Sequence, residues 1–280
     1  MQRAFSRFVG VDLGGARGKT TAVAELRGTA SGVEVIEVAT RAGRLPWTDD
    51  TLIGRLAVPD PDRVIAVDAP LTSTACGRCE EPVCPGMEAC VDPAVVWLRT
   101  TGRALVQKVA AEAASGASSS VVARPTLPAA RLAPYAHRAT DVVMTYQRGL
   151  LPLSSLGAAN GTISARAGQL RRRLRGAGYQ LHGNLLEVSP AATIGALCGP
   201  RMARGYKRDA DPWVTRASIL ELFQDLSFAP QSRMAREDVL RNDHCFDAVI
   251  SGYTAYLWSR EGWEVPTGVF EADGWIFCPP

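Results

Sequence analysis

Two short apolar segments of the chain each end in an aspartate, and these carboxylates are the residues best placed to do chemistry. The segment RFVGVD ends at Asp12, and the segment RVIAVD ends at Asp68. β-Branched residues favour strands, and small or turn-forming residues follow each segment. A charged group at the end of a buried strand is costly unless something pairs with it. The pattern predicts that both acids meet at the carboxyl edge of one sheet, around a divalent cation.

Three further acids are candidates for the same site. Glu187 interrupts the apolar segment LLEVSP, while Asp243 and Asp247 are four residues apart in DHCFDAVISGYTAYLW and share one face of a predicted helix. Asp243 also suits the first turn of a helix, where an acid is favourable. Asp247 lies within an apolar helix, which favours a functional role. The alternative interpretation is that Asp12 and Asp68 only form turns and that Glu187 faces water.

Carboxylates that converge on divalent cations suggest phosphodiester cleavage. Two-metal sites hold their cations about 4 Å apart, and Mg²⁺ prefers oxygen ligands. We therefore expect Mg²⁺ or Mn²⁺ at the carboxylates and a nucleic acid of undetermined type as the substrate. The sequence has no recognisable Ser-His-Asp triad or zinc-protease motif.

Four cysteines lie close together in the segment CGRCEEPVCPGMEAC, at positions Cys76, Cys79, Cys84 and Cys90. Four thiolates at this spacing can bind one zinc ion or an iron–sulfur cluster. The alternative is a loop of free cysteines. Because the segment begins shortly after Asp68, we expect its metal site to lie beside the carboxylates.

The composition places few limits on function. The chain has 280 residues, is 46% hydrophobic and carries a net charge of +3, so it can bury a large core but has no strong overall field for nucleic acid. Neither a membrane-spanning run nor a signal-like segment is recognisable in the sequence, so we expect a cytoplasmic protein with no membrane partner. Reduced cysteines are usual there, which favours metal binding or burial over disulfides. The oligomeric state is left open.

The hydrophobic pattern predicts an α/β fold with a mixed central sheet flanked by helices. The predicted strands span residues 7–13, 19–26, 33–40, 63–69 and 185–190. The predicted helices span 48–57, 93–114, 138–149, 160–176, 191–198, 213–227 and 244–260, and a hairpin is predicted in GVFEADGWIFCP. The β-β-β-α-β start is typical of the ribonuclease H-like fold, and it also begins the domains of actin-like ATPases and sugar kinases. We expect one domain over residues 1–280, with a cysteine-rich insertion at 72–92 and a helical or irregular insertion at about 115–180.

The chain resembles the domain of unknown function 429 family, which comprises predicted nucleases of ribonuclease H-like fold. The resemblance rests on FVGVDLGG, VIAVDAPL, LLEVSPAATIGAL, DHCFDAVISGYTAYL and the closing GWIFCP, in this order. It implies a metal-dependent nuclease site that consists of Asp12, Asp68, Glu187 and Asp247, with Asp243 as a helper. It also implies a role for Lys207, which would neutralise the acids or contact a phosphate; the alternative is an ordinary loop lysine.

Other segments leave alternative functions open. Arg171 and Arg172 lie in the basic segment QLRRRLRGAG, which either contacts a nucleic-acid backbone or is a solvated helix face. The segment GGARGKTT is similar to the first phosphate-binding hairpin of actin-like ATPases, so an ATPase or kinase is the second hypothesis. The third hypothesis is a non-catalytic binding module that the four-cysteine metal site stabilises.

Overall fold

The computed structural model describes residues 5–15, 20–115, 132–149, 161–232 and 234–280, and the chain divides into two compact units. Unit 1 consists of Met1–Ala69, Ala165–Glu264 and Phe277–Pro280, and unit 2 consists of Pro70–Ser164 and Val265–Ile276. The predicted insertion at 72–92 falls in unit 2. The predicted insertion at about 115–180 falls in both units, and parts of it lie outside the described residues. The single domain stays a prediction.

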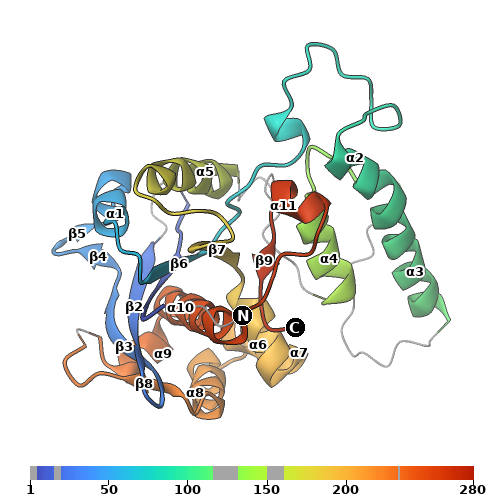
Figure 1. The fold of residues 1–280 in the computed structure, drawn as a ribbon. Helices are drawn as coiled ribbons and strands as arrows, with labels where there is room; N and C mark the ends of the chain where they lie inside the picture. Colours follow the sequence, from blue (N-terminus) through green and yellow to red (C-terminus); the bar gives the residue numbers. More distant parts are fainter. Residues whose placement is uncertain (1–4, 16–19, 116–131, 150–160, 233) are drawn as a thin grey trace. The chain divides into compact units, whose positions relative to one another are not determined.

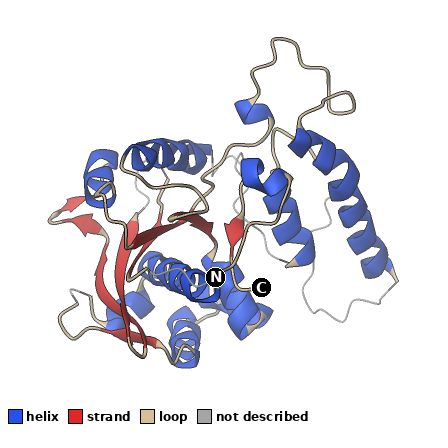
Figure 2. Ribbon diagram, in the orientation of Figure 1, coloured by secondary structure: helices blue, strands red, loops and turns tan. Residues whose placement is uncertain are grey.

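A mixed sheet, whose strands are red in Figure 2, forms the centre of unit 1. Its seven strands have the order β8-β3-β2-β1-β6-β7-β9; the first six lie wholly in unit 1, and Ile276 of β9 belongs to unit 2. The strands are β1 (Arg7–Asp12), β2 (Ala22–Thr29), β3 (Gly32–Ala39), β6 (Arg63–Asp68), β7 (Leu185–Val188), β8 (Leu226–Phe228) and β9 (Ile276–Phe277). β2 is antiparallel to β1 and β3, whereas β6 is parallel to β1 and β7. A separate small hairpin joins β4 (Arg41–Ala42) to β5 (Leu45–Pro46). The α/β class with a mixed sheet is therefore confirmed.

Helices lie on both faces of this sheet, with α1 and α5 on the face opposite to α10 (Figure 1). The helices are α1 (Asp49–Leu56), α5 (Gly161–Gly176), α6 (Pro190–Cys198), α7 (Pro200–Arg208), α8 (Pro212–Leu222), α9 (Arg236–Arg241) and α10 (Asp243–Glu261). Local sequence explains several of their ends. Thr48 and Thr51 form a capping box at the start of α1, and the Asn242 side chain caps α10 by accepting from the Cys245 N–H at 3.2 Å.

Helix α10 packs directly on β1, β2 and β6. The helix approaches so closely because glycines face each other across the contact: a Cβ atom on Gly10 would lie 1.9 Å from the Ala248 carbonyl oxygen and 2.4 Å from the Gly252 nitrogen. A hydrogen bond of 2.8 Å between Thr193 of α6 and Thr254 holds the other side of the helix. The position of α10 along the sheet is therefore closely determined.

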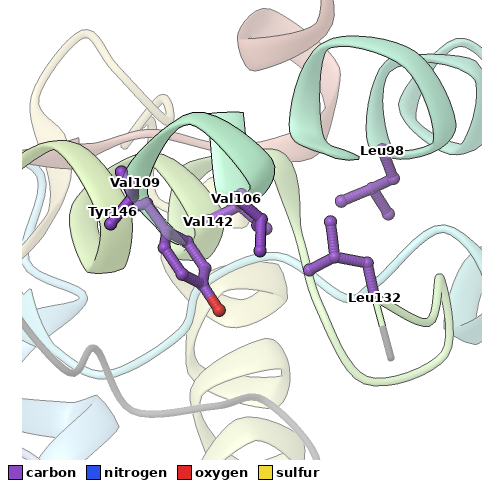
Figure 3. Packing of buried hydrophobic residues seen from close by; sticks show 6 residues of the cluster. All are labelled: Leu98, Val106, Val109, Leu132, Val142 and Tyr146. Carbon is purple, nitrogen blue, oxygen red and sulfur yellow. The ribbon is translucent and has the colours of Figure 1, made fainter. Parts of the chain in front are cut away.

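Unit 2 has its own small hydrophobic core (Figure 3). Its helical elements are the short turn η1 (Cys76–Arg78), α2 (Pro93–Trp97), the π-helical turn η2 (Leu98–Gly102), α3 (Arg103–Ala114), α4 (Ala139–Gln147) and α11 (Val269–Asp273). The buried core residues are Leu98, Val106, Val109, Leu132, Val142 and Tyr146. The long helix predicted to start at Pro93 is confirmed, with Asp92 as its N-cap and a π-helical turn within it.

A buried polar network connects distant segments of unit 2. The fully buried Arg138 donates to Asp141 and, at 2.8 Å, to the Thr72 hydroxyl. Thr72 in turn donates to the Asp273 carbonyl oxygen at 2.7 Å, and the Asp273 carboxylate accepts from Arg78 at 2.7 Å. Because each buried charge has an oppositely charged partner, the network fixes these segments without leaving an unpaired ion.

Two predictions of local structure are wrong, and one helix was missed. The predicted C-terminal hairpin is instead the short helix α11 followed by β9, because Gly274 turns the chain at a φ of 97° after the helix. The helix predicted at 213–227 ends at Leu222, and β8 then pairs with β3 as an edge strand. Helix α7 was not predicted.

We expect the substitution Gly10→Ala to lower the free energy of unfolding by about 3 kcal/mol or more, since the new methyl group would overlap backbone atoms of α10 that cannot rotate away. Urea unfolding monitored by circular dichroism measures this change. The matched control is Gly54→Ala in α1, where a Cβ would meet nothing within 4 Å. It should be neutral or stabilise by up to about 1 kcal/mol. Equal stability of both variants would contradict the close packing of α10 on β1.

Candidate functional site

Three carboxylates meet at one edge of the unit 1 sheet. Asp12 ends β1 and Asp68 ends β6, and the two residues are direct partners in the parallel register of these strands. Asp247 lies in the second turn of α10. It reaches the two aspartates because α10 packs closely on β1 at Gly10. One ligand oxygen from each of the three lies within 4.8 Å of the others. The predicted convergence of Asp12, Asp68 and Asp247 is thus present in the structure.

Asp247 is the most buried member of this carboxylate cluster, with 1% of its side chain exposed. Its Oδ2 accepts from the Lys207 ammonium of α7 at 2.5 Å, so the predicted proximity of Lys207 to the acids is also present. Its Oδ1 is buried and has no hydrogen-bond partner among the described residues. A buried carboxylate oxygen without a partner is costly, and a bound cation would satisfy it.

Crowding of like charges perturbs the protonation of the cluster. Burial, followed by the charges of Asp247 and Asp12, raises the pKa of Asp68 well above the usual carboxyl range. Burial also raises the pKa of Asp247, although the Lys207 charge opposes that increase. Burial lowers the pKa of Lys207, but the carboxylates outweigh this effect and hold it above its ordinary value. Lys207 therefore stays charged and balances one of the three carboxylates.

His244 adds a second basic partner at the edge of the cluster. Its Nδ1 is hydrogen-bonded to Asp12 Oδ2 at 2.5 Å. This hydrogen bond is the main cause that raises the pKa of His244, and the charge of Asp243 contributes. Asp243 itself lies in the first turn of α10, behind the Asn242 cap, and does not belong to the group of three carboxylates. Asp243 therefore affects the cluster only through its neighbour His244.

Glu187 lies apart from the three clustered acids. It is paired in register with Val67, and residues in register on parallel strands share a face, so strand alternation directs it away from the face of Asp68. Its charge still contributes to the raised pKa of Asp68. On its own face it interacts electrostatically with the partly buried Arg171 of α5, whereas Arg172 is exposed. The predicted substrate contacts of both arginines stay predictions.

The four cysteines of the loop lie in unit 2 as free thiols; Cys76, Cys79 and Cys84 are exposed, and Cys90 is partly buried. Burial raises the pKa of the Cys76 thiol, and the charges of the other three cysteines add to this increase. The four side chains therefore share one electrostatic neighbourhood. The predicted metal at these cysteines, and its predicted location beside the carboxylates, stay predictions.

Sequence reasoning missed Tyr206 as a neighbour of the site. Its ring is buried beside Asp247, and burial followed by the charge of Asp247 raises the pKa of the phenol. The Lys207 ammonium lies 5.3 Å from the centre of the same ring. The segment RGYKR contained a signal, since the tyrosine precedes the lysine, but only the packing of α7 on α10 shows that both contact one carboxylate.

The substitution Asp68→Asn should stabilise the metal-free protein at pH 7.5, because it removes a buried carboxylate that the charges of Asp247 and Asp12 repel. The folded state binds this proton more tightly than the unfolded state, so the carboxyl group increasingly destabilises the fold as the pH rises from the ordinary carboxyl pKa towards its raised value in the folded state. The difference between wild type and variant should therefore shrink at pH 5. Urea unfolding in EDTA at both pH values measures it, with the exposed Asp50→Asn as the control. A variant less stable than wild type at pH 7.5 would contradict this electrostatic account.

Comparisons with known proteins give a family but no close relative. The search of curated proteins found no match, and the search of solved structures also found none. Among the described residues, no helix is both long enough and apolar enough to cross a membrane. One family, described as Protein of unknown function (DUF429), matches residues 10–269, which include all three clustered carboxylates. Because this match covers most of the chain, the protein belongs to the DUF429 family.

Proposed function

We propose that this protein is a divalent-metal-dependent nuclease of ribonuclease H-like fold, and that the carboxylate cluster Asp12, Asp68 and Asp247 holds Mg²⁺ or Mn²⁺. The observation that carries the proposal is the approach of three ligand oxygens to within 4.8 Å of one another. The unpartnered Oδ1 of Asp247 supports it, because oxygen ligands of this kind suit Mg²⁺. The fold supports it as well: three antiparallel strands, a helix, and then a strand parallel to β1 are the start expected of this fold class.

The charge balance of the site also favours a divalent cation. Lys207 neutralises one carboxylate, and His244 offsets Asp12 when it is protonated. Both cations are partly exposed, with 42% and 38% of their side chains accessible, so they can move away when a stronger positive charge arrives. A freed Lys207 would lie next to the metal and could contact a phosphate oxygen of the substrate.

The reaction is hydrolysis of a phosphodiester: a water oxygen bonds to phosphorus, and the bond from phosphorus to the leaving sugar oxygen breaks. When bound, divalent cations activate the water and stabilise the leaving oxygen. The protein's own part is to hold the three carboxylates rigidly, and the packing of α10 on β1 and β6 does this. His244 is close enough to Asp12 to keep that carboxylate in one orientation.

The test is cleavage of single- and double-stranded DNA, RNA and hybrid duplexes with Mn²⁺ or Mg²⁺. We expect activity that EDTA abolishes, and a loss of at least about 100-fold in each of Asp12→Asn, Asp68→Asn and Asp247→Asn, since removing even an outer-shell partner of a metal ligand costs about 10–100-fold. Asp50→Asn, on the exposed surface of α1, should keep full activity. Cleavage that persists unchanged in the three variants would come from a contaminant and would reject the proposal. Calorimetric binding of ATP with Mg²⁺, with no cleavage, would instead favour the ATPase hypothesis.

Lys207 gives an independent test of the metal site. The substitution Lys207→Met removes the ammonium that competes for Asp247, so we expect Mn²⁺ to bind roughly tenfold more tightly in isothermal titration calorimetry, equivalent to about 1.4 kcal/mol. Lys207→Arg retains the charge and is the control, with affinity close to wild type. Cleavage by Lys207→Met at saturating Mn²⁺ should still fall if the lysine contacts a phosphate. Unchanged Mn²⁺ affinity in the methionine variant would show that no metal binds at Asp247.

A further inference from the structure

The second half of the four-cysteine loop is held in place by one arginine. Arg99 Nη1 donates to the carbonyl oxygens of Met87, Glu88 and Cys90 at 3.0, 2.8 and 2.7 Å. Gly86, at a φ of 80°, turns the chain so that its carbonyl accepts from the Cys90 N–H at 3.0 Å. The backbone at Cys90 is therefore fixed, although no helix or strand contains it.

The first half of the loop is anchored just as firmly. The Cys76 N–H donates to the Pro134 carbonyl at 3.2 Å, and Arg78 donates to the buried Asp273 carboxylate at 2.7 Å. Hydrogen bonds thus hold the backbone of unit 2 at Cys76 and at Cys90. Cys79 and Cys84 lie on the chain between these two positions. None of these contacts involves a residue of the carboxylate cluster.

The middle of the loop has no buried apolar side chain that would keep it ordered. Val83 and Val91 are 79% and 87% exposed, and Cys79 and Cys84 are exposed as well. From Cys79 to Asp92 the described chain contains no helix or strand. Apart from Met87 and Cys90, which pack against buried residues of unit 2, the loop buries little apolar surface, so it needs another source of stability, and a metal centre that binds four thiolates provides one.

The separation of the sulfurs distinguishes between the metal centres that four cysteines can bind. A zinc ion with four thiolates at about 2.3 Å holds its sulfurs about 3.8 Å apart. In the described part of the chain, no three of these sulfurs lie within 4.8 Å of one another, although the four thiols are close enough to interact electrostatically. An iron–sulfur cluster binds its thiolates through different iron atoms, which holds the sulfurs farther apart than a single ion does.

We propose that Cys76, Cys79, Cys84 and Cys90 bind an iron–sulfur cluster that gives the loop of unit 2 its structure. The guanidinium group of Arg99, which lies in η2 and holds the loop backbone, offsets part of the negative charge that four thiolates bring to such a cluster. The cluster is independent of the carboxylate site, so the nuclease proposal and this one can fail separately.

The experiment is anaerobic purification of the full chain from iron-supplemented cells, followed by measurement of iron, acid-labile sulfide, zinc and visible absorption. We expect brown protein with iron and sulfide in similar amounts and little zinc. Each of Cys76→Ala, Cys79→Ala, Cys84→Ala and Cys90→Ala should lose at least about two thirds of the visible absorption and iron. Cys198→Ala, at the end of α6 in unit 1, is the matched control and should keep both.

Two results would overturn the proposal. One is stoichiometric zinc without sulfide, which would assign the loop to a zinc site. The other is colourless protein that does not gain visible absorption when ferrous iron and sulfide are added anaerobically after thiol reduction. Far-ultraviolet circular dichroism of each variant shows whether it folds. Even if every loop variant unfolds, the metal and sulfide content of the wild-type protein decides the question.

Discussion

The close approach of α10 to β1 is the contact on which the candidate site depends. Gly10 leaves no side chain between strand and helix, and Gly252 leaves none on the helix side, so the two backbones meet directly. A larger residue at either position would push the helix outwards and carry Asp247 away from Asp12 and Asp68. The site is therefore built by backbone packing, which is more rigid than side-chain contact.

The same packing also brings three negatively charged groups close together, and this concentration of charge gives the site its chemistry. Three carboxylates within 4.8 Å repel one another, and burial removes much of the water that would screen them. Lys207 and His244 offset part of this repulsion, yet one oxygen of Asp247 still has no partner in the described structure. Sites that are unfavourable without a ligand are common where function requires charge to be concentrated. A divalent cation is the ligand that best relieves this arrangement.

Unit 2 is stabilised by a small hydrophobic core and a buried polar network. Its helices bury a small core, and the network around Arg138 and Asp273 connects segments that are far apart in the sequence. The cysteine loop is held at its start and from Met87 to Cys90, whereas Cys79 and Cys84 between these parts are exposed. Unit 2 thus combines a well-packed base with a segment whose order depends on something other than hydrophobic burial, and this contrast is the physical basis for assigning a metal centre to the cysteines.

Local sequence determined much of the fold and part of the site. Alternating apolar residues predicted β1 to β3, β6 and β7, cap residues predicted the starts of several helices, and the acids at strand ends predicted Asp12 and Asp68 as neighbours, because parallel strands place their ends at one edge. Glu187 shows the limit: its strand and charge pattern looked the same, but its register with Val67 directs it to the other face. The hairpin predicted near the C-terminus is wrong because Gly274 turns the chain at a φ of 97° after the short helix α11. The family resemblance predicted Asp247 and Lys207 beside Asp12 and Asp68. Only the tertiary structure decided that Tyr206 and His244 join them, since these contacts connect residues from separate elements and no local pattern encodes the distance between them.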